Sequence, residues 1–254
     1  MLREILTVNI YTLLMIFARL GAAMMFMPVF GNSNVLVRAR LLLALTISFL
    51  MLPVLGPYVP PMPAQPFPLL LLVLGEVTIG LFFCLILQAL LTPIDLAGNF
   101  ISYSAGLANA FVFDANAMQQ SQIITSFLSL TAITMVLVSN SHHLMLEGMI
   151  GTYDLFRPGA GVPIGDMSGV FVSTLSQTFR IGMSLAAPLV VFSLTFNTTL
   201  GLINRLVPQM QVFFVGMPLQ ILCGLFLLGV SLPAIMLWFL RTFSDNLLLF
   251  APAR

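Results

Sequence analysis

Two adjacent histidines and a glutamate form the most suggestive metal-binding pattern in this sequence. His143 and Glu147 are four residues apart, so on a helix they share one face, with His142 beside them. Zinc proteases carry His-Glu-x-x-His instead, and no third ligand follows here at a useful spacing. We interpret the histidines as capping the end of the apolar segment Ile123–Val138 near the membrane interface, and we expect no metal.

Two aspartates in separate segments, Asp114 and Asp166, could in principle form an intramembrane catalytic pair. Paired carboxylates can share a proton and activate water. Both residues lie in Asn- or Gly-rich, loop-like surroundings outside any continuous apolar helix. They are therefore interpreted as solvated loop acids, and the sequence predicts no catalytic residue.

The third pattern is a pair of opposite charges, Arg19 and Glu76, each well inside a long apolar segment. A charge at the centre of a bilayer costs about 2.5 to 3.5 kcal/mol, so both groups require compensation. Three interpretations follow: a packed pair within the chain, contacts to other subunits, or a transport relay. The sequence leaves all three open.

The segments that carry these residues have the composition of a membrane protein. Of 254 residues, 59% are hydrophobic and 7% are charged, against about a quarter charged in an ordinary globular domain. The mean hydropathy is +1.09. No basic run exceeds the pair Arg38 and Arg40, and the net charge is +1, so we expect no nucleic-acid partner.

Six apolar segments are predicted to be helical. A bilayer core takes roughly 20 helical residues to cross, so the second and fourth are too short and are expected to be half-spans, re-entrant pieces or helices buried by a neighbouring protein. The segments are Ile10–Phe30, Leu41–Leu55, Leu69–Leu91, Ile123–Val138, Ile181–Ile203 and Val212–Leu240. The predicted fold class is an all-α integral membrane protein with broken and half-length helices.

Three intervals between these segments differ in character. A Pro-rich loop (57–63, with Pro66 and Pro68) and a Gly/Pro-rich loop (158–165) are expected to break helices. The interval Thr92–Gln122 is the most polar stretch of the chain.

The carboxylates are separated from the arginines along the chain. No arginine occurs from Leu41 to Phe156, although this stretch holds five acids. Each acid must therefore find a distant arginine, a partner subunit, water or a proton. These acids are Glu76, Asp95, Asp114, Glu147 and Asp154.

Small residues recur inside the apolar segments, where they allow helices to approach closely. This pattern predicts helix association without naming the partner. The residues are Ala18, Ala22, Gly182, Ala186, Gly216, Gly224 and Gly229.

Several stretches, in shared order and spacing over essentially the whole chain, resemble the FliR family. This family holds the R subunits of the flagellar type III export gate and their virulence-secretion counterparts. The most specific stretch is Gly201–Pro218, followed by Gly224-Leu225. The supporting stretches are Ala18-Arg19 leading to Pro28-Val29-Phe30-Gly31, then Ala97–Ile101 with Gly106-Leu107, then His142-His143, and then Phe156-Arg157-Pro158-Gly159.

The resemblance implies a structural subunit and not an enzyme, with no cofactor. It implies a hetero-oligomer with P- and Q-type export-gate subunits and the B-type switch subunit, in the bacterial inner membrane at the flagellar basal body. Unfolded flagellar proteins are the expected cargo. The alternative that we keep is a secondary transporter of a small solute, with Arg19, Glu76 and broken helices forming a midplane site.

The same resemblance implies a division of the chain and a plug. Residues 1–178 are expected to form a P-like portion, and residues 179–254 a Q-like helical hairpin and tail. A loop at about 106–122 is expected to project into the closed channel. The residues expected to plug or line the pore are Gly106, Ala108, Asn109, Phe111, Val112, Phe113, Asp114 and Met118.

A second set is expected to make buried polar contacts or contacts with other subunits. It combines the stranded acids with polar residues of the first segment and the hairpin tip. Its members are Arg19, Glu76, Asp95, Glu147, Arg205 and Gln209.

Overall fold

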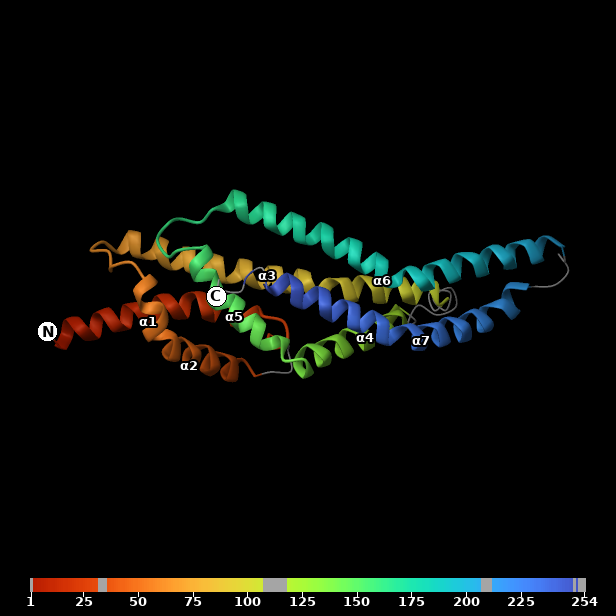
Figure 1. The fold of residues 1–254 in the computed structure, drawn as a ribbon, viewed down its shortest axis with the longest axis horizontal. Helices are drawn as coiled ribbons and strands as arrows, with labels where there is room; N and C mark the ends of the chain where they lie inside the picture. Colours follow the sequence, from red (N-terminus) through yellow and green to blue (C-terminus); the bar gives the residue numbers. More distant parts are fainter. Residues whose placement is uncertain (1, 32–35, 107–117, 207–211, 249, 251–254) are drawn as a thin grey trace. The chain divides into compact units, whose positions relative to one another are not determined.

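The computed structural model describes residues 2–31, 36–106, 118–206, 212–248 and 250. These residues form helices and connecting turns and contain no strand, which confirms the all-α prediction (Figure 1). The helices are α1 (Leu2–Phe26), α2 (Val37–Leu55), a short 3-10 helix η1 (Gly56–Tyr58), α3 (Pro66–Ser104), α4 (Met118–Val138), α5 (Ser141–Leu155), α6 (Ile164–Leu206) and α7 (Val212–Leu248).

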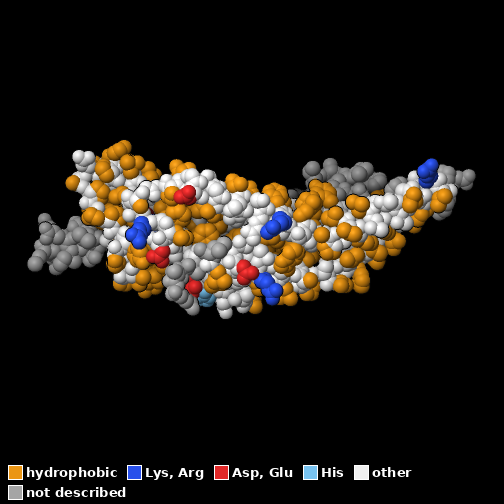
Figure 2. Space-filling model, turned by 45° about the horizontal axis from the view of Figure 1, so that its top comes forward, with side chains coloured by type: hydrophobic (Ala, Val, Ile, Leu, Met, Phe, Trp, Pro, Cys, Tyr) orange, Lys and Arg blue, Asp and Glu red, His pale blue; other side chains and the backbone are white. Residues whose placement is uncertain are grey.

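Within the described residues, four helices are long and apolar enough to cross a membrane. They are α2 continued through η1, α3, α6 and α7, and the number becomes five if α4 and α5 form one broken span. Asn140, in the left-handed conformation at φ 59°, separates α4 from α5. The chain is thus an integral membrane protein, and Figure 2 shows hydrophobic side chains over much of the surface in view.

Most helix limits differ from the sequence-based prediction: α1 ends at Phe26 and not Phe30, α4 begins at Met118 and not Ile123, α6 runs from Ile164 to Leu206 and not from Ile181 to Ile203, and α7 continues past Leu240 to Leu248. Helix α2 begins at Val37 and continues through η1 to Tyr58, so it is long enough to span the membrane. The prediction stopped at the arginines, but charges at the end of a span can reach the interface without ending the helix. Pro66 and Pro68, predicted to break helices, instead lie in the first turn of α3, where proline is tolerated.

Helix α3 also runs through Pro93 to Ser104, so the first part of the polar interval is helical. Helix α5 was not predicted as a separate element. Its histidines and acids interrupt the apolar pattern on which the prediction depended.

The chain packs as two units. Unit 1 comprises Met1–Leu90, Asn140–Thr174 and Ser244–Arg254, and unit 2 comprises Leu91–Ser139 and Leu175–Phe243. The predicted boundary between residues 178 and 179 falls inside the continuous helix α6. The predicted boundary separates a part that resembles P-type subunits from a part that resembles Q-type subunits, whereas the two units are defined by packing. The boundary therefore stays a prediction.

In unit 1, α1 lies against α2, and its side chains from Met15 to Met24 are largely buried. In unit 2, glycines allow close helix contacts. A Cβ at Gly182 would lie 2.9 Å from Leu96, one at Gly224 would lie 2.9 Å from Ala105, and one at Gly216 would lie 2.6 Å from Leu200. Gly229 has open space around it. Three of the predicted small residues therefore serve contacts within the chain.

Candidate functional site: a buried arginine clamp and an exposed polar seam

Helices α1 and α3 cross closely enough to bring Arg19 and Glu76 together. The contact depends on Gly80, which lies one turn after Glu76 on the same face of α3. A methyl group at Gly80 would collide with the carbonyl oxygen of Arg19 and would lie 3.2 Å from the Cβ of Ala22. The small residues thus set the backbone separation that the ion pair requires.

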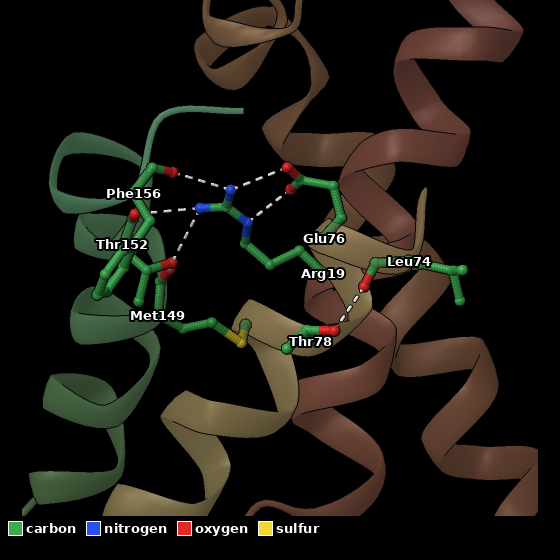
Figure 3. A network of polar contacts seen from close by, with 7 residues as sticks. All are labelled: Arg19, Leu74, Glu76, Thr78, Met149, Thr152 and Phe156. Atoms are coloured by element: carbon green, nitrogen blue, oxygen red, sulfur yellow. Dashed lines mark hydrogen bonds and ion pairs between the residues drawn. The ribbon is translucent and has the colours of Figure 1, made fainter. Parts of the chain in front are cut away.

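The guanidinium of Arg19 forms a two-pronged ion pair with Glu76. Its Nε donates to Oε2 at 2.6 Å and its Nη2 donates to Oε1 at 3.0 Å (Figure 3). Both side chains are buried, with 0% of Arg19 and 3% of Glu76 exposed. Paired geometry of this kind is the strongest form of arginine–carboxylate hydrogen bonding.

The remaining N–H groups of Arg19 donate to the end of α5. Nη1 reaches the Thr152 carbonyl at 3.1 Å and the Thr152 hydroxyl at 3.4 Å, and Nη2 reaches the Phe156 carbonyl at 2.9 Å. The Thr152 carbonyl also accepts the backbone N–H of Phe156 at 2.8 Å. All five N–H groups of Arg19 therefore have an acceptor.

This arrangement also caps a helix. The cation lies at the C-terminus of α5, where the helix dipole favours positive charge and where carbonyls lack helical partners. The guanidinium carbon lies 4.0 Å from the centre of the Tyr153 ring, which adds a cation–π contact. Arg19, Glu76, Thr152, Tyr153 and Phe156 together form what we call the Arg19 clamp, and it joins α1, α3 and α5.

The clamp explains how two stranded charges are tolerated. Removing one member of a buried pair leaves the other uncompensated, which typically costs about 3 to 5 kcal/mol. Because every N–H of Arg19 is occupied, no donor remains to hold a solute. The geometry is that of a structural fastening.

Unit 2 presents polar groups on its surface instead. The hydroxyl of Ser129 on α4 donates to the carboxylate of Asp95 on α3, and the hydroxyl of Thr125 donates to Asn99 Oδ1 at 3.2 Å. Asp95 and Asn99 are both exposed. We call these four residues the polar seam.

A glycine again sets the spacing of the two helices. A Cβ at Gly98 would lie 2.7 Å from the Cα of Thr125. Within the described residues, the carboxylate of Asp95 has no ion-pair partner. The seam is therefore a charged, exposed feature between α3 and α4.

The other predicted contact residues are spread over the chain. Glu147 is exposed on α5, and Arg205 is exposed in the last turn of α6. Gln209 lies outside the described residues. Neither Glu147 nor Arg205 belongs to the clamp or to the seam.

Most of the predicted plug also lies outside the described residues, namely Ala108, Asn109, Phe111, Val112, Phe113 and Asp114. Gly106 has φ +79°, and a Cβ there would lie 3.1 Å from Gln220 Cδ. Met118 is the first residue of α4. The plug therefore stays a prediction.

The structure also bears on the candidate metal site at the histidines and on the candidate aspartate pair. Within the described residues, no group of three or more His, Cys, Asp and Glu side chains could hold a metal ion. The rings of His142 and His143 are in contact, with their centres 4.2 Å apart and their planes tilted by 40°. Asp166 lies exposed in the first turn of α6, not in a loop, and Asp114 is outside the described residues.

Sequence reasoning missed the α5 end of the clamp. Thr152 and Phe156 contribute carbonyl oxygens, which every residue type has, so no side-chain pattern could identify them. It also missed Gln220, which is buried and donates to the Ser104 carbonyl at 3.2 Å. A single glutamine within the apolar run of α7 was the available signal.

Comparison with known proteins gives a consistent result over nearly the full chain. Residues 10–246 match the model of the family described as bacterial export proteins, family 1. The flagellar biosynthetic protein FliR of Caulobacter vibrioides is 36% identical over 231 residues, which cover 91% of this chain and 92% of that protein.

More distant FliR proteins match along a similar length. The FliR of Bacillus subtilis is 28% identical, covering 91% of this chain and 90% of its own. The FliR of Escherichia coli is 27% identical, covering 86% and 83%. With a family match over most of its length and a close relative above 30% identity, this chain belongs to family 1 of the bacterial export proteins, the family of the flagellar biosynthetic protein FliR.

Proposed function

We propose that this chain is a structural channel subunit of the flagellar type III protein export gate. In this proposal it forms, with P- and Q-type subunits, the pore through which unfolded flagellar proteins leave the cell, and it contacts a B-type switch subunit. It acts in the inner membrane at the flagellar basal body and performs no catalysis. Its membership of the export family supports a component of the flagellar export apparatus.

The exposed polar seam is the observation that supports a pore subunit in contact with other subunits. Lipid would leave the Asp95 carboxylate unpaired, at a cost of about 2.5 to 3.5 kcal/mol near mid-bilayer. Polar groups exposed on apolar helices are suited to neighbouring subunits or to a water-filled channel, not to hydrocarbon.

The transporter alternative required Arg19 and Glu76 to hold a solute. In the structure these two residues hold each other, and Arg19 uses its last donors on α5. The exposed Asp95 carboxylate and Asn99 amide of the polar seam lie in unit 2, away from Arg19 and Glu76 along the chain. The geometry thus favours an assembly subunit over a self-contained carrier.

The decisive experiment is purification of the tagged full-length chain in mild detergent, with mass spectrometry of the proteins that accompany it. We expect P- and Q-type subunits in fixed ratios. Recovery of a monodisperse monomer that binds a small solute would overturn the proposal.

The plug is part of the same proposal and has its own test. Deleting Asn109–Gln119 is expected to leave assembly intact and to raise leakage of small ions or dyes, since a hydrophobic constriction blocks ions by dewetting. Leakage should be measured in vesicles that contain the purified assembly. Unchanged leakage in a fully assembled complex would assign the segment to scaffold.

A further inference from the structure

Unit 1 contains two adjoining cavities beside α3 that the export assignment does not use, and only Glu76 of the Arg19 clamp lines one of them. One, of about 400 Å³, lies between α3 and the loop before α6, and Arg157 and Leu72 are among its lining residues. The other, of about 430 Å³, lies between α3 and the first turns of α6, where Leu85 and Phe171 contribute. Val162 lines both cavities. We call them together the α3–α6 groove.

The groove follows one face of α3. Its lining residues recur at three- and four-residue steps, from Leu71 through Gly75, Thr78 and Phe82 to Leu85. From Pro68 to Leu85 this face is about 26 Å long at 1.5 Å per residue. One leaflet with its headgroups is about 20 Å thick, so a tilted α3 would carry the groove across a single leaflet.

The charge in the groove lies at one end. Arg157 is exposed and is the cation that lines the first cavity. The carboxylate of Glu76 also lines this cavity, but Arg19 neutralises it through two hydrogen bonds. The accessible charge at this end is therefore the Arg157 guanidinium, a group that binds phosphate with two parallel hydrogen bonds.

The other end is apolar even where hydroxyl groups line it. The Thr78 hydroxyl donates to the Leu74 carbonyl at 2.7 Å, as Figure 3 shows, and the Ser168 hydroxyl donates to the Gly165 carbonyl at 2.7 Å. Both hydrogens are used within their own helices. The walls offered to an occupant are hydrocarbon from Leu81, Phe82 and Phe171.

We propose that the α3–α6 groove binds one anionic glycerophospholipid, with its phosphate at Arg157 and an acyl chain between α3 and α6. Basic pockets between membrane helices bind anionic headgroups. A cationic end joined to a narrow apolar slot fits an amphiphile. This proposal does not rest on the export assignment.

The test is native mass spectrometry of the tagged full-length chain, with any subunits that accompany it, after lipid removal. Phosphatidylglycerol and phosphatidylcholine with identical acyl chains are then added back. Both lipids carry a phosphate, but the choline cation of phosphatidylcholine offsets its charge, so we expect phosphatidylglycerol to be retained about fivefold better, which corresponds to the roughly 1 kcal/mol that one arginine contributes toward an anionic headgroup. Arg157→Gln should remove the preference. Arg180→Gln is the control and should keep it, because Arg180 is an exposed arginine on α6 that does not line the groove.

Two further measurements identify the occupant. Ser168→Trp, which fills the apolar cavity, should reduce retention of both lipids at least fivefold. Competition by millimolar inorganic phosphate as strong as that by phosphatidylglycerol would show a simple anion site and overturn the proposal. Equal retention of the two lipids by the unmodified chain would also overturn it, as would a Ser168→Trp variant that loses partner subunits but keeps its lipid count. The proteins in the same spectra report on the export proposal separately.

Discussion

Helix α3 carries two carboxylates in opposite surroundings. In unit 1, Glu76 is buried and accepts two hydrogen bonds from the Nε–Nη2 edge of the Arg19 guanidinium. In unit 2, Asp95 is exposed and receives a hydrogen bond from the Ser129 hydroxyl. The comparison separates acids that hold this chain together from acids that are left for something outside it, although both occur in the same apolar helix.

The physical difference lies in what each acid contributes to the folded chain. Glu76 offsets a buried cation and, through it, holds the end of α5, so its loss is expected to affect folding. Asp95 makes one hydrogen bond at the surface, where such bonds contribute little to stability. Its loss is expected to affect assembly.

The largest effect is expected from Glu76→Gln. The neutral amide leaves the Arg19 cation buried without compensation, so the free energy of unfolding should fall by about 3 to 5 kcal/mol. Thermal unfolding of the detergent-solubilised chain, followed by loss of its monodisperse chromatographic peak, measures this change. The double variant Arg19→Met/Glu76→Leu should recover most of the loss, and wild-type stability for Glu76→Gln alone would refute the clamp.

A smaller loss of stability is expected from Gly80→Ala. The added methyl meets the carbonyl of Arg19 and must push α1 from α3, at a cost of about 1 to 3 kcal/mol. Gly229→Ala is the matched control, because open space surrounds Gly229 and alanine is the better helix former by up to about 1 kcal/mol. The same unfolding assay compares the two, and equal behaviour would argue against close packing at Gly80.

Asp95→Asn should produce the opposite pattern. The side chain keeps its shape and its contact with Ser129, so the stability of the isolated chain should change by less than about 1 kcal/mol. The yield of co-purified P- and Q-type subunits should nevertheless fall severalfold, as quantified by mass spectrometry. Asp166→Asn, at an exposed acid in the first turn of α6, should leave that yield unchanged. A loss of chain stability with normal assembly would reverse the comparison.

The smallest change in the chain itself is expected from Arg205→Glu at the end of α6. Reversing a charge in the last turn opposes the helix dipole by about 0.3 to 1 kcal/mol, so insertion of the chain should be nearly normal. Contacts with neighbouring subunits should weaken more, which a pull-down alongside a membrane-insertion assay would detect. A normal yield of the complex would exclude Arg205 from the interface.

Composition and hydropathy pattern were enough to predict that this chain is an integral membrane protein with an all-α fold. Long apolar runs with few charges require a bilayer or apolar neighbours, and proline- and glycine-rich stretches correctly marked the turns before α3 and α6. The family resemblance was equally readable, because motif order is a property of the sequence. Helix ends were less predictable, since hydropathy ended α3 at Leu91 whereas the backbone continues to Ser104.

Only the tertiary structure decided what happens to each charge. The sequence showed that Arg19 and Glu76 needed compensation but left three ways of providing it. The choice depended on a glycine contact between α1 and α3 and on backbone carbonyls at the end of α5, neither of which a side-chain pattern encodes. Partner identity is a matter of three-dimensional proximity. One carboxylate of α3 is therefore enclosed and the other exposed, although along the sequence both are single acids in an apolar run.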